Sequence, residues 1–152
     1  MITADIILEN LRASSKKQVF QLMAEAAGDA LIGKTADIFD ALIEREMIGS
    51  TGIGHGVAVP HIKLVSLKKI YGVLARLEKP VDYDAMDRQP VDIVFMILAP
   101  SDTKTTLHLK ALAQASRFLK DQEICAEIRA SASQPRLESI LNEWLKKHSD
   151  KK

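Results

Sequence analysis

The chain has 152 residues, a formal net charge of +1, and 47% hydrophobic residues. This length predicts one domain with a core of its own, and the balanced charge argues against a nucleic-acid or anionic-membrane partner. The single cysteine, Cys125, is expected in the core and fits a reducing compartment. No leader pattern opens the chain, and the longest apolar run, Ile93 to Pro100, is too short to cross a bilayer. We therefore expect a cytoplasmic protein with no membrane insertion.

Two helices are predicted in the first third of the chain. Ser15 and Gln18 form a capping-box pattern, and apolar residues follow at helical spacing, with Gly33 as the stop. A second helix is expected from near Thr35 to Gly49, and its apolar side is formed by Ile38, Phe39, Leu42, Ile43 and Met47. Arg45 falls in its last turn, at the edge of that side.

Three strands are expected in the middle of the chain, at residues 57–59, 70–77 and 91–99. The third is apolar on both faces, which is typical of a central strand covered on each side. Between the last two, the polar segment EKPVDYDAMDRQP, residues 78–90, is expected to be a surface excursion.

Three further helices are predicted, and they complete the architecture. The first is capped by Asp102 or Thr103, the second covers residues 122–130, and the third begins near Pro135 with a buried stripe of Leu137, Ile140, Leu141, Trp144 and Leu145. Residues 146–152 are expected to be a frayed basic tail. The sequence therefore predicts one domain over 1–152, an α/β sandwich with a mixed β-sheet flanked by helices.

The segment GSTGIGHGVAVPH, residues 49–61, has four glycines in eight positions. It fails the dinucleotide-binding pattern, because valine stands where the third glycine is needed. It fails the P-loop pattern as well, because His55 follows Gly54 where lysine is required. Since Pro60 favours extended backbone before it, the segment leads into a strand. We interpret the glycines as keeping the surroundings of His61 open.

Two kinds of histidine chemistry remain for this segment. A metal hydrolase would use His55, His61 and His108, although no accompanying carboxylate or cysteine pattern supports it, and we expect no metal and no cofactor. A neutral imidazole can instead act as a nucleophile that carries a phosphoryl group. Such a site needs positioning and donors for the phosphoryl oxygens, which backbone N–H groups and the hydroxyls of Ser50 or Thr51 could supply.

The segment from Glu46 to His61 resembles the active-site signature of the fructose/mannitol-type enzyme IIA of the phosphoenolpyruvate-dependent phosphotransferase system. That signature consists of an acidic residue, a spacer, an apolar-Gly pair, two further residues, and an apolar-Ala-apolar-Pro-His run. In this sequence they are Glu46, Ile53-Gly54 and Val57-Ala58-Val59-Pro60-His61. The standalone nitrogen-regulatory relatives are similar over essentially the whole chain. One position departs from the pattern, because Ile62 follows the histidine where a small residue is usual.

The resemblance implies roles for particular residues. His61 would be the phosphorylated residue, Arg45 would lie on the phosphate side, and His108 would match a second histidine that orients or stabilises it. From the residues alone, Arg45 could instead interact with the helix dipole, and His108 could be a core histidine. The phosphate-binding loop would comprise Ser50, Thr51, Gly52, Gly54 and His55, although the two hydroxyl residues could simply end the helix and His55 could only shape the loop.

The expected function is that of a phosphoryl carrier, a phosphotransferase with a transient phosphohistidine. It would accept the group on His61 from a histidine phosphocarrier protein, then pass it on or signal by its phosphorylation state. Since neither a membrane domain nor a cysteine-bearing IIB domain follows in this sequence, nitrogen- or potassium-linked regulation is favoured. The alternatives are a sugar-specific IIA subunit that donates to a separate IIB cysteine, and a non-catalytic regulatory binding module, which only Ile62 suggests.

Overall fold

The computed structural model describes residues 2–32, 34–65 and 67–148. Within these residues the chain forms one mixed sheet of six strands, which are β1 Ile6–Leu11, β2 Gly52–Gly54, β3 Val57–Ala58, β4 His61–Leu64, β5 Tyr71–Val81 and β6 Val91–Pro100. The five α-helices of the same ranges are α1 Lys16–Ala27, α2 Thr35–Ile48, α3 Thr105–Lys120, α4 Gln122–Arg129 and α5 Gln134–His148. None of them is both long and apolar enough to cross a membrane.

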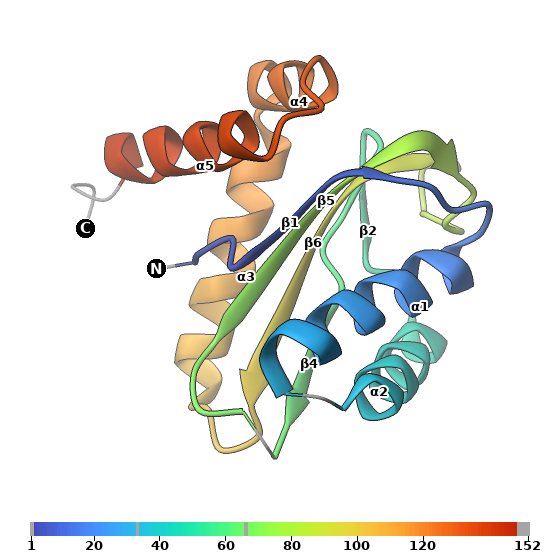
Figure 1. The fold of residues 1–152 in the computed structure, drawn as a ribbon, viewed down its shortest axis with the longest axis vertical. Coiled ribbons are helices and arrows are strands. Elements are labelled where there is room, and N and C mark those ends of the chain that lie inside the picture. The colour runs from blue at the N-terminus through green and yellow to red at the C-terminus, as the bar shows by residue number, and fades with distance from the viewer. Residues whose placement is uncertain (1, 33, 66, 149–152) are drawn as a thin grey trace.

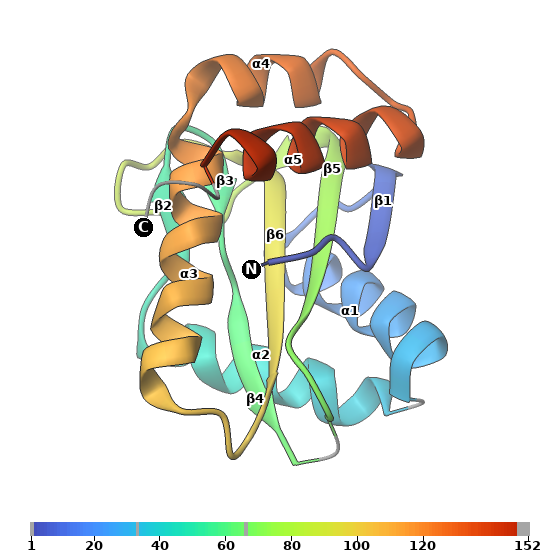
Figure 2. The same ribbon diagram turned by 90° about the vertical axis from the view of Figure 1, so that its left-hand side faces the viewer.

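The helices cover both faces of the sheet. Helices α1 and α2 pack on one face, and α3, α4 and α5 lie on the other (Figures 1 and 2). The strand order is β1-β5-β6-β3-β2, and β4 continues beyond β3 along the same edge of β6. Strands β5 and β6 are antiparallel, whereas β3 and β4 both run parallel to β6. The predicted α/β sandwich with a mixed sheet is confirmed.

The N-terminal helices begin where the sequence predicts. The side chain of Ser15 accepts a hydrogen bond from the backbone N–H of Gln18, which satisfies one unpaired donor of the first turn of α1. A π-helical turn, Gly28–Ile32, follows α1, and Gly33 lies outside the described residues. In α2 the apolar side includes Ile38 and Leu42, but the expectation for Met47 was wrong, because its side chain is 81% exposed.

Three strands were missing from the sequence prediction. Strand β1 holds Glu9 and Asn10, which are uncommon in strands, and it forms by pairing with the distant β5. Strand β2 has only three residues, of which two are glycine. Strand β4 directly follows Pro60, so the short strand expected to end at residue 59 resumes after it.

Three other boundaries differ from expectation. Strand β5 extends to Val81, and Tyr83 is fully buried, so residues 78–90 are only in part a surface excursion. Helix α3 has Lys104 at its N-cap with no side-chain cap bond, instead of Asp102 or Thr103. Helix α5 continues through Lys147 to His148, which is three residues into the expected tail, and residues 149–152 lie outside the described range.

Truncating a side chain on the buried side of α2 should lower the free energy of unfolding more than truncating one on its exposed side. Leu42 is fully buried against the sheet, so Leu42→Ala should lower the free energy of unfolding by about 2–5 kcal/mol. Met47→Ala, on the exposed side of the same helix, should change it by less than about 0.5 kcal/mol. Urea unfolding followed by circular dichroism measures both values, and equal losses would contradict this assignment of the buried side.

Candidate active site around His61

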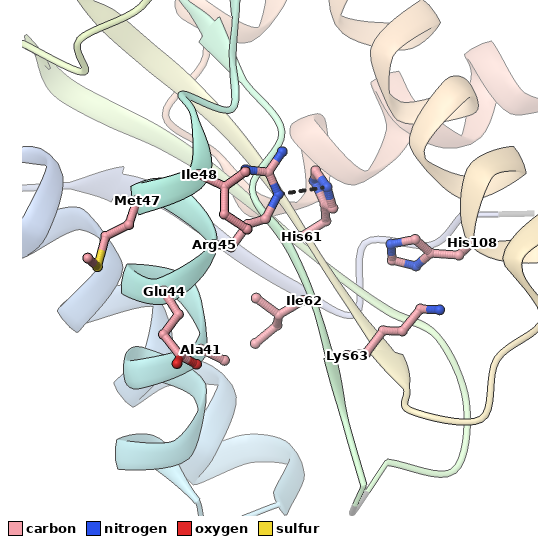
Figure 3. A pocket seen from close by; sticks show the side chains of 9 residues that line it. All are labelled: Ala41, Glu44, Arg45, Met47, Ile48, His61, Ile62, Lys63 and His108. Carbon is pink, nitrogen blue, oxygen red and sulfur yellow. Dashed lines mark hydrogen bonds between the residues drawn. The ribbon is translucent and has the colours of Figure 1, made fainter.

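His61 is the first residue of β4, at an edge of the sheet. Pro60 cannot donate to the sheet, but its carbonyl accepts from the N–H of Ile97 in β6 at 2.9 Å and so keeps the strand in register. Since side chains alternate along a strand, His61 and Val59 face α3, whereas Ile62 packs into the core beside α1 and α2. The imidazole therefore stands between α2 and α3 (Figure 3).

Both ring nitrogens of His61 have hydrogen-bond partners. Nδ1 lies 2.9 Å from the carbonyl oxygen of Val59, and Nε2 lies 3.4 Å from Nε of Arg45. A carbonyl only accepts and a guanidinium only donates, so Nδ1 carries the proton and Nε2 presents its lone pair. Burial lowers the pKa of His61, and the nearby Arg45 charge lowers it further. The ring is therefore a neutral nucleophile near pH 7.

Arg45 is held at the end of α2. Its Nη1 donates to the carbonyl oxygen of Gly49 at 3.0 Å, while its Nε points at His61. The guanidinium thus satisfies an unpaired carbonyl beyond the last helical turn and also faces the nucleophile. The contact with Gly49 fits the helix-end interpretation, and a role of Arg45 toward phosphate stays a prediction.

His108 enters the site from the first turns of α3. Its ring centroid lies 5.7 Å from that of His61 (Figure 3). Burial lowers the pKa of His108, and the neighbouring His61 and Lys63 act in the same direction. Its buried Nδ1 has no hydrogen-bond partner among the described residues, an arrangement that is costly unless another polar group arrives.

A cavity of about 720 Å³ opens beside these side chains, as Figure 3 shows. Its lining residues come from α2, β4 and α3, and they are Ala41, Glu44, Arg45, Met47, Ile48, His61, Ile62, Lys63 and His108. Met47 and Ile48 are 81% and 83% exposed at its rim. The cavity combines the imidazole of His61 with two cationic side chains, one acidic side chain and an exposed apolar rim, which suits contact with another protein.

The predicted loop residues divide into two groups. Ser50, Thr51 and Gly52 line a smaller cavity of about 220 Å³ with Arg45 and His61. Their hydroxyls are already engaged within the protein, because Ser50 Oγ accepts from the N–H of Gly52 at 3.1 Å and Thr51 Oγ1 contacts Glu46.

Gly54 and His55 lie at the tip of the β2–β3 hairpin, away from His61. Val57 pairs with Ile93 and His61 with Ile97, so about four residues, or roughly 13 Å, separate this tip from the imidazole along β6. Gly54, His55 and Gly56 all have positive φ, and a Cβ on Gly56 would meet Nη2 of Arg129 at 2.7 Å. These glycines serve a tight turn, which differs from our interpretation that they clear space around His61.

The position of His55 at the hairpin tip argues against the metal hydrolase alternative. Because His55 is at the tip, the ligand set of His55, His61 and His108 is not assembled. Within residues 2–32, 34–65 and 67–148, no group of three or more histidine, cysteine, aspartate or glutamate side chains could hold a metal ion.

The sequence analysis did not predict the contacts that three residues make at the site. Glu46 belongs to the recognised signature, yet its contact with Thr51 could not be read from spacing. Val59 acts through its backbone carbonyl, which no residue pattern reveals. Tyr83 comes from a segment predicted to be polar surface, and its hydroxyl reaches Thr51 at 2.8 Å.

Comparisons with known proteins show which family the chain resembles. A sequence model of the family described as phosphoenolpyruvate-dependent sugar phosphotransferase system, EIIA 2, matches residues 1–144. The chain is 43% identical to a nitrogen regulatory protein of Bradyrhizobium diazoefficiens, over 93% of this chain and 92% of that protein.

Solved structures extend the likeness to the fold. The crystal structure of nitrogen regulatory protein IIA-Ntr from Neisseria meningitidis has a TM-score of 0.82 and 32% identity, and covers 90% of this chain and 92% of that one. The Escherichia coli complex of enzyme IIAMTL with phosphorylated IIBMTL, at 18% identity and a TM-score of 0.75 over 94% of this chain and 98% of that one, shares the fold. The chain thus belongs to the type 2 EIIA family of the phosphotransferase system, as a phosphoryl-transfer domain similar to the nitrogen regulatory proteins.

Proposed function

We propose that His61 accepts a phosphoryl group on Nε2 from a histidine phosphocarrier protein and then donates it or signals by its phosphorylation state. The observation that carries this proposal is the pair of contacts on the ring. The Val59 carbonyl accepts a hydrogen bond from Nδ1–H, which leaves the lone pair of Nε2 directed at Arg45 beside the open cavity.

The bonds and protons of the phosphoryl transfer balance between the donor histidine and His61. Once Arg45 Nε releases its long hydrogen bond to Nε2, the lone pair of Nε2 attacks phosphorus and the N–P bond of the donor phosphohistidine breaks. The donor ring leaves neutral when its other nitrogen carries a proton. His61 keeps its Nδ1 proton and becomes a phosphorylated imidazolium, whose positive charge the Val59 carbonyl stabilises. The guanidinium of Arg45 and one N–H of the neutral His108 ring would then donate to the phosphoryl oxygens and stabilise the charge that develops there.

The regulatory role is favoured over a sugar-specific one by the nitrogen regulatory proteins among the similar chains. The output would then be regulation linked to nitrogen or potassium, exerted on a partner that distinguishes the two phosphorylation states. A IIB component is the corresponding acceptor if the chain serves sugar transport. Ile62, the departure that suggested a non-catalytic module, is 6% exposed in the core beside α1 and α2, and this orientation leaves the His61 ring uncrowded.

Labelling tests the assignment of His61. Incubation with phosphoenolpyruvate and the upstream carriers should label the wild-type protein at an acid-labile, base-stable position, and His61→Ala should remove the label because the nucleophile is gone. His148→Ala is the matched control, since His148 stacks on Trp144 at the far end of α5, and it should label like the wild type. Equal labelling of His61→Ala would refute the proposal.

Replacing Arg45 tests charge stabilisation. Arg45→Met should slow phosphoryl transfer by about 10²–10³-fold, the cost of removing one donor that stabilises a developing anion. Arg12→Met, which removes an exposed arginine paired with Glu78, should leave the rate unchanged. Rapid-quench measurement with purified phosphorylated donor gives both rates, and similar rates for the two variants would exclude a role for Arg45.

The lowered pKa of His61 predicts the pH dependence. A base whose pKa lies below its ordinary value of about 6.5 is neutral at pH 7, so labelling should be constant above this pH and should fall as acid protonates Nε2. Nuclear magnetic resonance titration of the His61 ring should give a midpoint below that of the same ring in urea. A midpoint in the folded protein at or above the unfolded value would contradict the buried, neutral state.

A further inference from the structure

A continuous path of hydrogen bonds joins Glu46 to the nucleophile. The backbone N–H of Thr51 donates to Glu46 Oε1 at 3.0 Å, and the carbonyl of Thr51 accepts from the N–H of Val59 at 3.0 Å. The carbonyl of Val59 in turn accepts from Nδ1 of His61 at 2.9 Å. The peptide groups that select the tautomer of His61 are therefore connected to a side chain at the end of α2.

The carboxylate at the start of this path is buried and paired. The side chain of Glu46 is only 7% exposed, and its Oε2 lies 3.0 Å from Nζ of Lys16 at the start of α1. Burying a charge is costly unless it is paired and hydrogen-bonded, and Glu46 meets both conditions through Lys16 and Thr51. Such an arrangement holds the last turn of α2, α1 and the start of β2 in one geometry.

Tyr83 completes the cluster from the loop after β5. Because the carboxylate only accepts, the Thr51 hydroxyl donates to Glu46, and the Tyr83 hydroxyl, 2.8 Å away, therefore donates to Thr51. Burial, and then the charge of Glu46, raise the pKa of Tyr83, so it stays a protonated donor. The Lys16 ammonium also lies 4.9 Å from the centroid of the Tyr83 ring. Each polar group of the cluster thus has a defined role.

We propose that Glu46, Thr51 and Tyr83 form a positioning unit that fixes the Val59 carbonyl and thereby keeps the proton of His61 on Nδ1. The polar side-chain atoms of the three are directed at one another, so they act on His61 through the backbone. The proposal rests on phosphoryl transfer at Nε2, since this nitrogen is nucleophilic only in the tautomer that the unit selects. Without the unit, the Val59 carbonyl would be free to shift, and only the long contact with Arg45 would oppose movement of the proton to Nε2.

The test compares variants that remove one hydroxyl each. Thr51→Val and Tyr83→Phe keep the shape of the cluster but break the link between Tyr83 and Thr51. ¹⁵N resonances of the unphosphorylated His61 ring should show a new population with the proton on Nε2, and kcat for labelling should fall about tenfold, the effect of weakening one hydrogen bond, with KM for the donor unchanged. Thr51→Ser keeps the hydroxyl and should restore both values.

A matched control separates positioning from stability. Asp92→Asn weakens an ion pair of 2.9 Å with Arg129 near the hairpin tip, and it should lower stability without changing the tautomer or kcat. An unchanged tautomer in Thr51→Val and Tyr83→Phe would overturn the proposal, as would an equal change in Asp92→Asn. Because the resonances are measured without phosphorylation, a shifted tautomer with unchanged labelling would uphold the positioning unit and refute transfer through Nε2.

Discussion

The parallel pairing of β4 with β6 is the constraint on which the site depends. Strand β6 is buried on both faces, so its register is fixed by the two hydrophobic layers that pack against it. Pro60 interrupts the neighbouring strand without losing register, because its carbonyl still accepts from Ile97. A slip of one residue would turn His61 toward α1 and α2 and turn Ile62 toward α3. The packing of the core therefore sets the direction of the His61 imidazole.

The glycines before His61 do not have the role that their number in the sequence suggested. Its positive-φ residues build the tip of a hairpin, and the tip is tied to α4 where Arg129 donates to the carbonyl of His55 at 3.0 Å. The part of the segment that governs chemistry is instead the extended run that ends in Val59 and Pro60. Open space around the imidazole comes from its place at a sheet edge between two helices.

Local patterns predicted the helices and the two long strands, because periodicity and caps are encoded within a few residues, as with Ser15 and Gln18. They failed for β1, which forms through pairing of Ile6 with the distant Val73, and for Tyr83, whose burial depends on contacts with Thr51 and with Phe20 of α1. The signature pointed to His61, and family resemblance pointed to Arg45 and His108. Contacts made by backbone groups, such as the Val59 carbonyl, depend on strand register, so local sequence patterns could not predict them.

The two nitrogens of His61 face environments with opposite physical properties. On the Nδ1 side, paired charges and peptide groups leave little freedom, and each polar atom has a defined partner. On the Nε2 side lie a cavity, the guanidinium of Arg45 and the exposed side chains of Met47 and Ile48. A group that is handed between proteins requires both, because the aim of the ring must be set before the partner arrives and the approach must stay open. Because the hydrogen bonds on the Nδ1 side fix the ring, the Nε2 side needs no further contacts to orient it and can stay open to a partner.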